Sequence, residues 1–276
     1  MKFFHNICIS SFASFGLIIV LLFNPGPHGI AHAEERKLVV VAEAWPPFEF
    51  EEDGKAVGIG VDIMSHIFKK MNVAFEVRIL PWARAWKMIE AGKVDAASSI
   101  SRKKERMQYL SYPNEDIWTS EYIFFVRRDK KKTSSMSYAQ AGKENLKIGV
   151  IKGNTYHEDF WKAFPNKADG TLNDQLEEAA DAETNLRKLA RGRIDLYVVD
   201  KIIGRYLISM MNLEDEITWY DNILFSKGYT IAFVKKSGYP RLKQIEERFE
   251  KELKRLKKSG QYNEIQKKWI KENPRH

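Results

Sequence analysis

Thiols are nearly absent from this sequence, in which Cys8 is the only cysteine among 276 residues. Cys8 lies in an N-terminal segment where Lys2 precedes an apolar run from Phe12 to Phe23, and Ala31-His32-Ala33 has the small-x-small form of a signal-peptidase site. We expect residues 1–33 to be a cleaved secretory signal, because a membrane span needs about 20 apolar residues. A retained anchor is the alternative. The mature chain would contain no disulfide, cysteine nucleophile or thiolate metal site.

Histidine is also scarce. Four of the six histidines fall in the expected signal or at the last residue, which leaves His66 and His157, far apart in the sequence. A zinc site or a histidine-based triad needs clustered side chains, so we expect neither a metal nor a cofactor. Gly58-Ile59-Gly60 follows a turn and does not open directly from a strand, so it is not a dinucleotide-binding fingerprint.

The charge of the chain is basic but mixed. Cleavage of the signal would remove Lys2 and lower the formal net charge from +8 to +7. Much of that charge lies between Lys235 and His276, where Lys or Arg alternates with Glu. This pattern is typical of an exposed helix with i,i+4 ion pairs. A secreted protein meets no genome, so we expect no nucleic-acid partner.

Strand and helix patterns alternate along the chain and then begin again. The first series combines short apolar strands with helices whose apolar residues recur at helical spacing, at residues 37–42, 60–71, 73–80, 83–91 and 95–98. After a strand at 121–126, the second series comprises residues 146–151, 184–191, 194–199, 202–210 and 229–234. Two α/β lobes are the simplest architecture for this pattern. Ligands of such folds bind at the carboxyl ends of strands and between domains.

A few aromatic and ionic residues could carry the chemistry. Trp45 and Trp82 follow strands and could be core plugs or flat walls for a ligand. Arg106 ends the charge run "SSISRKKER" and could be a solvated residue or a bidentate clamp on a carboxylate. Asp200 closes a strand and could cap the next helix or accept an ammonium group. Residues 153–156 precede a predicted helix, where free amides could bind an anion.

Six segments in order resemble the family 3 periplasmic solute-binding proteins, the polar amino-acid receptors of ABC importers. They are "LVVVAEAWPPFEF", "GKAVGIGVDIMSHIFKKM", "EAGKVDAA", "KKERMQYLSYP", "IGVIKGNTY" and "ARGRIDLYVVD". The resemblance covers about residues 37–272. It implies a two-lobed, type II periplasmic-binding-protein fold of the α/β class with a ligand cleft between the lobes. We predict that residues 34–127 form the first part of lobe 1, that 128–223 form lobe 2, and that 224–276 return to lobe 1 and add C-terminal helices.

The resemblance also implies roles for particular residues. Arg106 aligns with the arginine that binds the α-carboxylate of the ligand, and Asp200 aligns with the carboxylate that binds its α-ammonium group. The other expected site residues are two aromatic walls and three hydrogen-bonding hydroxyls: Trp45, Trp82, Ser99, Ser101 and Thr155. Arg102, Lys103 and Lys104 are expected at the surface, where they could steer anions toward the cleft.

The sequence departs from the family pattern beside the first strand. Family members that bind basic amino acids carry an acidic residue near position 42, where this chain has Ala42. Glu43 is adjacent, but neighbouring residues of a strand face opposite sides. These residues therefore do not decide the identity of the ligand.

The resemblance implies a monomeric periplasmic receptor that captures a small solute and delivers it to an inner-membrane ABC permease, and that is not an enzyme. The expected solute is an amino acid or a related carboxylate. One alternative is a cyclohexadienyl-dehydratase-like lyase on the same fold, which would need Glu43 or Asp200 as a general acid. The other is a ligand-sensing partner of a signalling receptor.

Overall fold

The computed structural model describes residues 36–154 and 156–270. The expected signal, residues 1–33, and the expected site residue Thr155 lie outside these ranges. Within them, no helix combines the length and the apolar character that a membrane span requires.

The first α/β region is built on a sheet with the strand order β4-β1-β5-β12. Its central strand β1 (Leu38–Ala42) pairs in parallel with β4 (Phe75–Ile79) and β5 (Ala96–Ile100). Parallel strands need helical crossovers, which this region supplies. The other elements are three short strands, a 3₁₀ turn and four helices: β2 (Phe50–Glu52), β3 (Lys55–Val57), β6 (Leu110–Ser111), η1 (Lys104–Arg106), α1 (Ile59–Met71), α2 (Trp82–Glu90), α7 (Leu242–Lys258) and α8 (Gln261–Trp269).

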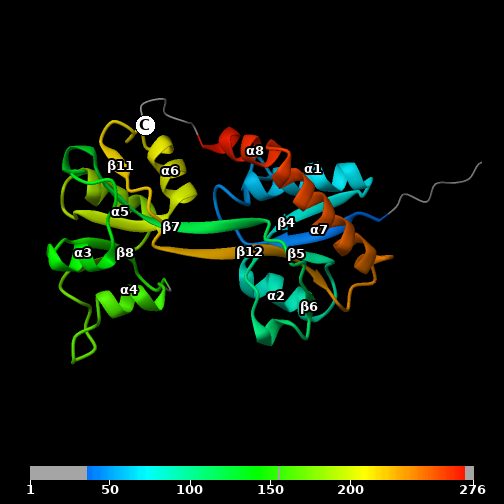
Figure 1. Cartoon of the computed structure of the whole chain (residues 1–276). Coiled ribbons are helices and arrows are strands. Elements are labelled where there is room, and N and C mark those ends of the chain that lie inside the picture. The colour runs from blue at the N-terminus through cyan, green and yellow to red at the C-terminus, as the bar shows by residue number, and fades with distance from the viewer. Residues whose placement is uncertain (1–35, 155, 271–276) are drawn as a thin grey trace, which may run out of the picture. The chain divides into compact units, whose positions relative to one another are not determined.

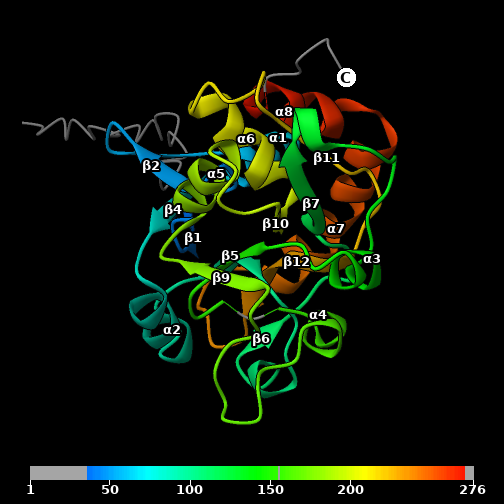
Figure 2. The same cartoon turned by 90° about the vertical axis from the view of Figure 1, so that its left-hand side faces the viewer.

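Helices cover both faces of this sheet, which is why every residue of β1 is apolar and buried. Val40 packs on one face in the cluster that contains Ile67 of α1 and Phe249 of α7. Val41, the next residue, packs on the other face with Ile89 of α2. Figure 1 shows α1, α7 and α8 together on one side and α2 on the other, and Figure 2 shows the first three grouped in the same way.

The second α/β region has the strand order β7-β10-β8-β9, with β11 paired to β7. β8, β9 and β10 run parallel to one another, whereas β7 is antiparallel to β10. The elements of this region are five strands, a 3₁₀ turn and four helices: β7 (Trp118–Arg127), β8 (Ile148–Ile151), β9 (Leu176–Ala179), β10 (Leu196–Asp200), β11 (Ile217–Trp219), η2 (Arg128–Lys130), α3 (Tyr138–Lys143), α4 (Glu158–Ala163), α5 (Ala182–Ala190) and α6 (Lys201–Met210). Phe124 and Phe125 of β7 pack on opposite faces, in two separate buried clusters.

The long strand β12 (Phe225–Val234) belongs to both regions (Figure 1). Its residues 225–229 pair with β7, and its residues from Thr230 pair with β5, with a register shift between Thr230 and Ala232. Tyr229 lies at this change of partner and lines the cleft described below. The predicted lobe boundaries after residues 127 and 223 stay predictions.

Candidate functional site

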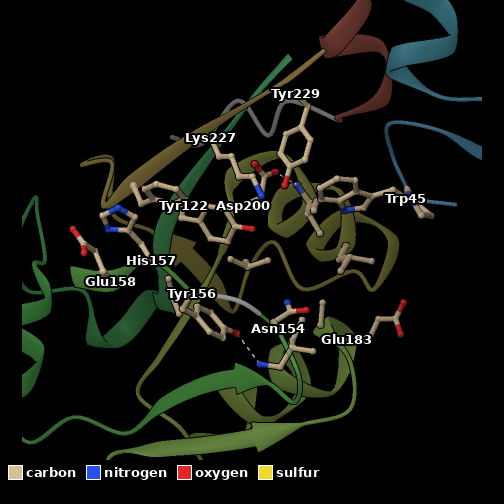
Figure 3. A pocket seen from close by; sticks show the side chains of 18 residues that line it. Trp45, Tyr122, Asn154, Tyr156, His157, Glu158, Glu183, Asp200, Lys227 and Tyr229 are labelled. Carbon is tan, nitrogen blue, oxygen red and sulfur yellow. Dashed lines mark hydrogen bonds between the residues drawn. The ribbon is translucent and has the colours of Figure 1, made fainter. Parts of the chain in front are cut away.

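A cleft of about 730 Å³ lies beside the carboxyl ends of β8 and β10. Aromatic side chains form much of its lining, and they come from β7, β12 and the loops after β1 and β8 (Figure 3). They are Trp45, Tyr122, Tyr156, His157, Phe225 and Tyr229. The polar groups are few, as is typical of a small-molecule site.

A second pocket, of about 240 Å³, adjoins the first. Trp45 and Tyr229 line both pockets, so they stand at the junction. The remaining lining comes from the end of β1, the start of α2 and the segment from β5 to η1: Glu43, Trp82, Ser98, Ser99, Ile100, Ser101 and Arg106.

The structure gathers six of the seven expected site residues around these adjoining pockets. Trp45, Trp82, Ser99, Ser101 and Arg106 line the smaller pocket. Asp200 lines the larger pocket, together with Trp45. Thr155 lies outside the described residues. Their roles toward a ligand stay predictions.

Arg106 lies over two indole rings. Its guanidinium carbon lies 5.0 Å from the ring centroid of Trp82 and 5.6 Å from that of Trp86. Arg106 Nη1 also donates a 3.4 Å hydrogen bond to the carbonyl oxygen of Ser101. Among residues 36–154 and 156–270, no carboxylate forms an ion pair with Arg106. These cation–π contacts help to hold the guanidinium in place and leave N–H groups for an anion in the pocket.

Asp200 caps helix α6, which is one of the two roles considered for it. Its Oδ1 accepts hydrogen bonds from the backbone N–H groups of Ile202 and Ile203, at 2.8 and 2.9 Å. Its Oδ2 accepts hydrogen bonds from Ser120 Oγ and from the Glu121 backbone N–H, at 2.7 and 3.1 Å. Burial raises the pKa of Asp200 to about 6 although these four donors oppose the change. A ligand ammonium group would have to share an oxygen that is already hydrogen bonded.

Glu49 is a buried acid that the sequence reasoning missed. It is fully buried, and its two oxygens accept hydrogen bonds from Ser98 Oγ at 2.7 Å and Ser99 Oγ at 2.6 Å. Ser99 Oγ in turn accepts a 2.7 Å hydrogen bond from Trp118 Nε1. Burial raises the pKa of Glu49 to about 7. The one available signal was an acid between Phe48 and Phe50 directly after a Pro-Pro turn.

The hydroxyl of Ser99 is therefore engaged inside the protein. Ser99 has a φ angle of 52°, in the left-handed region that few non-glycine residues adopt. This conformation and the bonds to Glu49 and Trp118 fix the end of β5 at the smaller pocket. Ser101, two residues later, presents its carbonyl oxygen to Arg106.

A cluster of aromatic rings lies at the junction of the two pockets. Trp118 stacks on Phe48 at 3.5 Å between centroids and on Tyr229 at 4.4 Å. Trp45 meets Tyr229 edge-on at 4.9 Å. Sequence reasoning named Trp45 but missed Trp118 and Tyr229, because strand pairing rather than local sequence brings these residues beside it.

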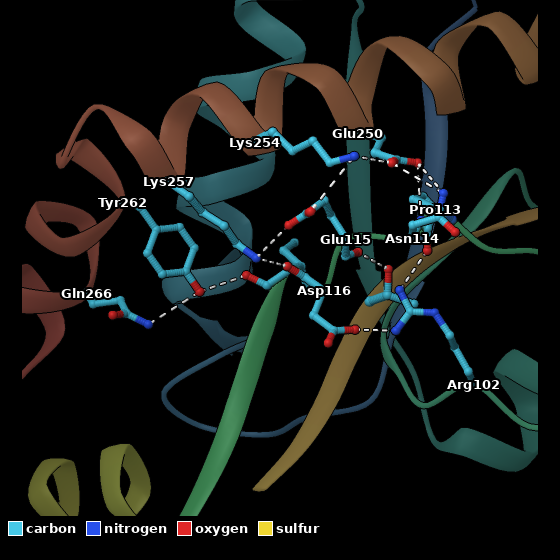
Figure 4. A network of polar contacts seen from close by, with 12 residues as sticks. Arg102, Pro113, Asn114, Glu115, Asp116, Glu250, Lys254, Lys257, Tyr262 and Gln266 are labelled. Carbon is cyan, nitrogen blue, oxygen red and sulfur yellow. Dashed lines mark hydrogen bonds and ion pairs between the residues drawn. The ribbon is translucent and has the colours of Figure 1, made fainter.

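Arg102 lies at the surface as expected, but its charge is compensated. It forms an ion pair with Asp116 and donates a 2.6 Å hydrogen bond to the carbonyl oxygen of Pro113 (Figure 4). Lys257 of α7 donates to the Asp116 carbonyl oxygen at 2.7 Å and to Glu115 at 3.2 Å, which extends the network to the C-terminal helices. Arg102 thus ties the segment after β5 to α7 and is not free to steer anions.

Residues 153–156, where an anion site was expected, include Thr155, which lies outside the described residues, so that site stays a prediction. Helix α4 begins at Glu158, and His157 is its N-cap. The first turn of α4 contains Glu158 and Asp159, whose charges disfavour an anion there. For metals, no group of three or more His, Cys, Asp or Glu side chains that could hold an ion occurs in the described part of the chain.

Comparison with known proteins agrees with this architecture. Residues 38–272 match the model of the bacterial extracellular solute-binding proteins, family 3. A probable histidine-binding protein of Campylobacter jejuni is 25% identical over 232 residues, which are 84% of this chain and 83% of that protein. The arginine-binding periplasmic protein of Mannheimia haemolytica is 23% identical, with 87% and 94% of the two chains covered.

A solved structure has the same fold. Substrate-binding domain 2 of GlnP from Lactococcus lactis superimposes with a TM-score of 0.67 at 20% identity, covering 89% of this chain and all of that domain. The expected two-lobed type II α/β fold is therefore confirmed.

Proposed function

The chain belongs to the bacterial extracellular solute-binding proteins, family 3, and from this membership we propose that it captures an amino acid or a related carboxylate in the periplasm. It then delivers this ligand to an inner-membrane ABC permease. The probable histidine-binding relative and the arginine-binding relative support an amino-acid ligand. The observation that carries the proposal is Arg106, a cation over two indole rings that has no carboxylate partner among the described residues and lies in the wall of a pocket.

In this proposal the carboxylate of the ligand binds the guanidinium of Arg106. A guanidinium offers two parallel N–H groups that match the two oxygens of a carboxylate. Trp45, Trp82 and Tyr229 provide flat surfaces for the rest of the ligand. Its ammonium group would face Asp200 on the other side of Trp45.

The hydrogen bonds of Asp200 favour binding over catalysis at this carboxylate. A lyase would need a general acid with a free proton-transfer position, and Asp200 has a pKa of about 6 that would suit this task. However, both oxygens of Asp200 already accept hydrogen bonds from four donors of the protein. We therefore propose that the ligand leaves unchanged, and its recovery intact after incubation checks this.

The test is a calorimetric screen of amino acids and small carboxylates against the protein and its Arg106→Ala variant. Loss of the cation should weaken the best ligand by at least about 30-fold, which corresponds to about 2 kcal/mol. Lys104→Ala is the matched control, because Lys104 is exposed in the same 3₁₀ turn but does not line the pocket. Near-normal affinity of Arg106→Ala would refute the carboxylate clamp.

A further inference from the structure

Lys227 places a second cation in the cleft. It lies on β12, lines the larger pocket, and projects from the strand toward the pocket (Figure 3). Its Nζ lies 5.1 Å from the ring centroid of Tyr229. Tyr229 also lines the smaller pocket, where Arg106 is found. The two cations therefore lie on either side of the aromatic junction between the pockets.

The surroundings of Lys227 are positive. Partial burial lowers its pKa, and the nearby charges of Lys103 and Arg106 lower it further. Within residues 36–154 and 156–270, no carboxylate forms an ion pair with any of these three cations. An anion bound among them would relieve this repulsion.

In the described part of the chain, no carboxylate that lines the larger pocket forms an ion pair with Lys227. Asp200 is buried and its oxygens accept four hydrogen bonds from the protein. Glu158 forms an ion pair with Lys162 at 3.3 Å. Figure 3 shows Glu158 and Glu183 at the periphery of the pocket, away from the end of Lys227.

We propose that the ligand is a dicarboxylic acid, of which the acidic amino acids are the amine-bearing members, and that Lys227 binds its second carboxylate. This inference rests on the proposed function, because Arg106 takes the first carboxylate. The chain between the two carboxylates lies along Trp45 and Tyr229, whose rings line both pockets. Lys227 is then the residue that determines specificity for an acidic over a neutral or basic ligand.

The experiment compares glutamate with glutamine, which has nearly the same shape but lacks the second charge. Calorimetry on the full chain should give at least tenfold tighter binding of glutamate. Lys227→Gln should lose this preference by weakening glutamate and leaving glutamine unchanged. Lys152→Gln is the matched control, since Lys152 is exposed and does not line the pocket, and it should keep the preference. The unliganded variants should melt within about 2 °C of the parent protein, because surface substitutions change stability little.

The outcomes separate this inference from the proposed function. If glutamine, arginine or histidine binds as tightly as glutamate, or if Lys227→Gln keeps the preference, the dicarboxylate assignment is wrong and the amino-acid receptor stands. If no amino acid or small carboxylate binds at all, both the dicarboxylate assignment and the proposed function are wrong.

Discussion

Glu49 should make the stability of this protein depend on pH. The side chain is fully buried, and the only donors to its carboxyl group among the described residues are the hydroxyls of Ser98 and Ser99. Two neutral donors do not compensate a buried negative charge, so burial raises its pKa from 4.5 to about 7. The space around the carboxyl group of Glu49 is also tightly filled, because a Cβ added at Gly60 would lie 2.1 Å from Glu49 Oε1.

The sign and size of the effect follow from the two pKa values. The folded protein keeps the proton of Glu49 up to about pH 7, whereas the unfolded chain loses it near pH 4.5. The free energy of unfolding should therefore fall as the pH rises between these values and then stay level. Each tenfold difference in proton affinity is worth about 1.4 kcal/mol, so the loss from Glu49 amounts to about 3 kcal/mol.

Urea denaturation of the parent protein and of Glu49→Gln, from about pH 5 to pH 8, measures this loss. Glutamine keeps the shape but cannot ionise, so the difference between the two free energies should change by about 2 kcal/mol over this range. The pKa of Asp200 is about 6, so this residue also lowers the free energy of unfolding as the pH rises. It does so equally in both proteins, and its contribution cancels in the difference. Glu51→Gln, at an exposed carboxylate on β2, is the control. A difference that does not vary with pH would refute the reasoning.

Two further predictions concern α6. Gly204→Ala should lower the free energy of unfolding by about 1–3 kcal/mol, because the new Cβ would lie 2.2 Å from the buried ring of Phe125. Urea denaturation would show this as a lower urea concentration at the midpoint of unfolding. Asp200→Ala should cost about 2 kcal/mol at neutral pH in the same assay, since it leaves two helix N–H groups and the Ser120 hydroxyl without their acceptor. A loss below about 0.5 kcal/mol would contradict either argument.

The sequence predicts best those strands and helices whose own pattern of apolar residues shows which of their faces are buried. The strand expected at 37–42 forms at Leu38–Ala42, because a continuous apolar run fits a strand covered on both faces. The helix expected at 60–71 forms at Ile59–Met71, because its apolar residues recur at helical spacing.

Elements that depend on distant partners were predicted short or not at all. The strand expected from residue 229 begins at Phe225, because its first half pairs with β7 and carries the polar residues Ser226 and Lys227. β9, with the sequence LEEA, shows no strand pattern of its own and is held by parallel pairing with β8.

The residues of the candidate site show the same contrast between what local sequence predicts and what only the fold creates. Arg106 and Trp45 lie in segments that resemble the family pattern, and Trp82 follows a predicted strand. The sequence alone therefore identified all three as candidates. Glu49 lies in the first of the segments quoted for the resemblance and Lys227 lies in none of them, and the importance of both comes from burial and from the charges that the fold places around them. Such information is absent from local sequence because it is created by long-range pairing.

The distribution of charge in the cleft bears on the ligand more directly than the names of distant relatives do. The carboxylate of Asp200 accepts hydrogen bonds from the start of α6 and from two donors of β7, which stabilise its negative charge. The positive charges of Arg106 and Lys227 remain at the pocket surface, without a carboxylate partner among the described residues. A basic side chain such as that of arginine would meet these cations, and besides Asp200 the lining carboxylates without an ion pair among the described residues are Glu43 in the smaller pocket and Glu183 at the periphery of the larger one. At 23–25% identity, the residues that face the ligand can change while the fold persists, so a cleft of this sign can belong to the same family as arginine and histidine receptors.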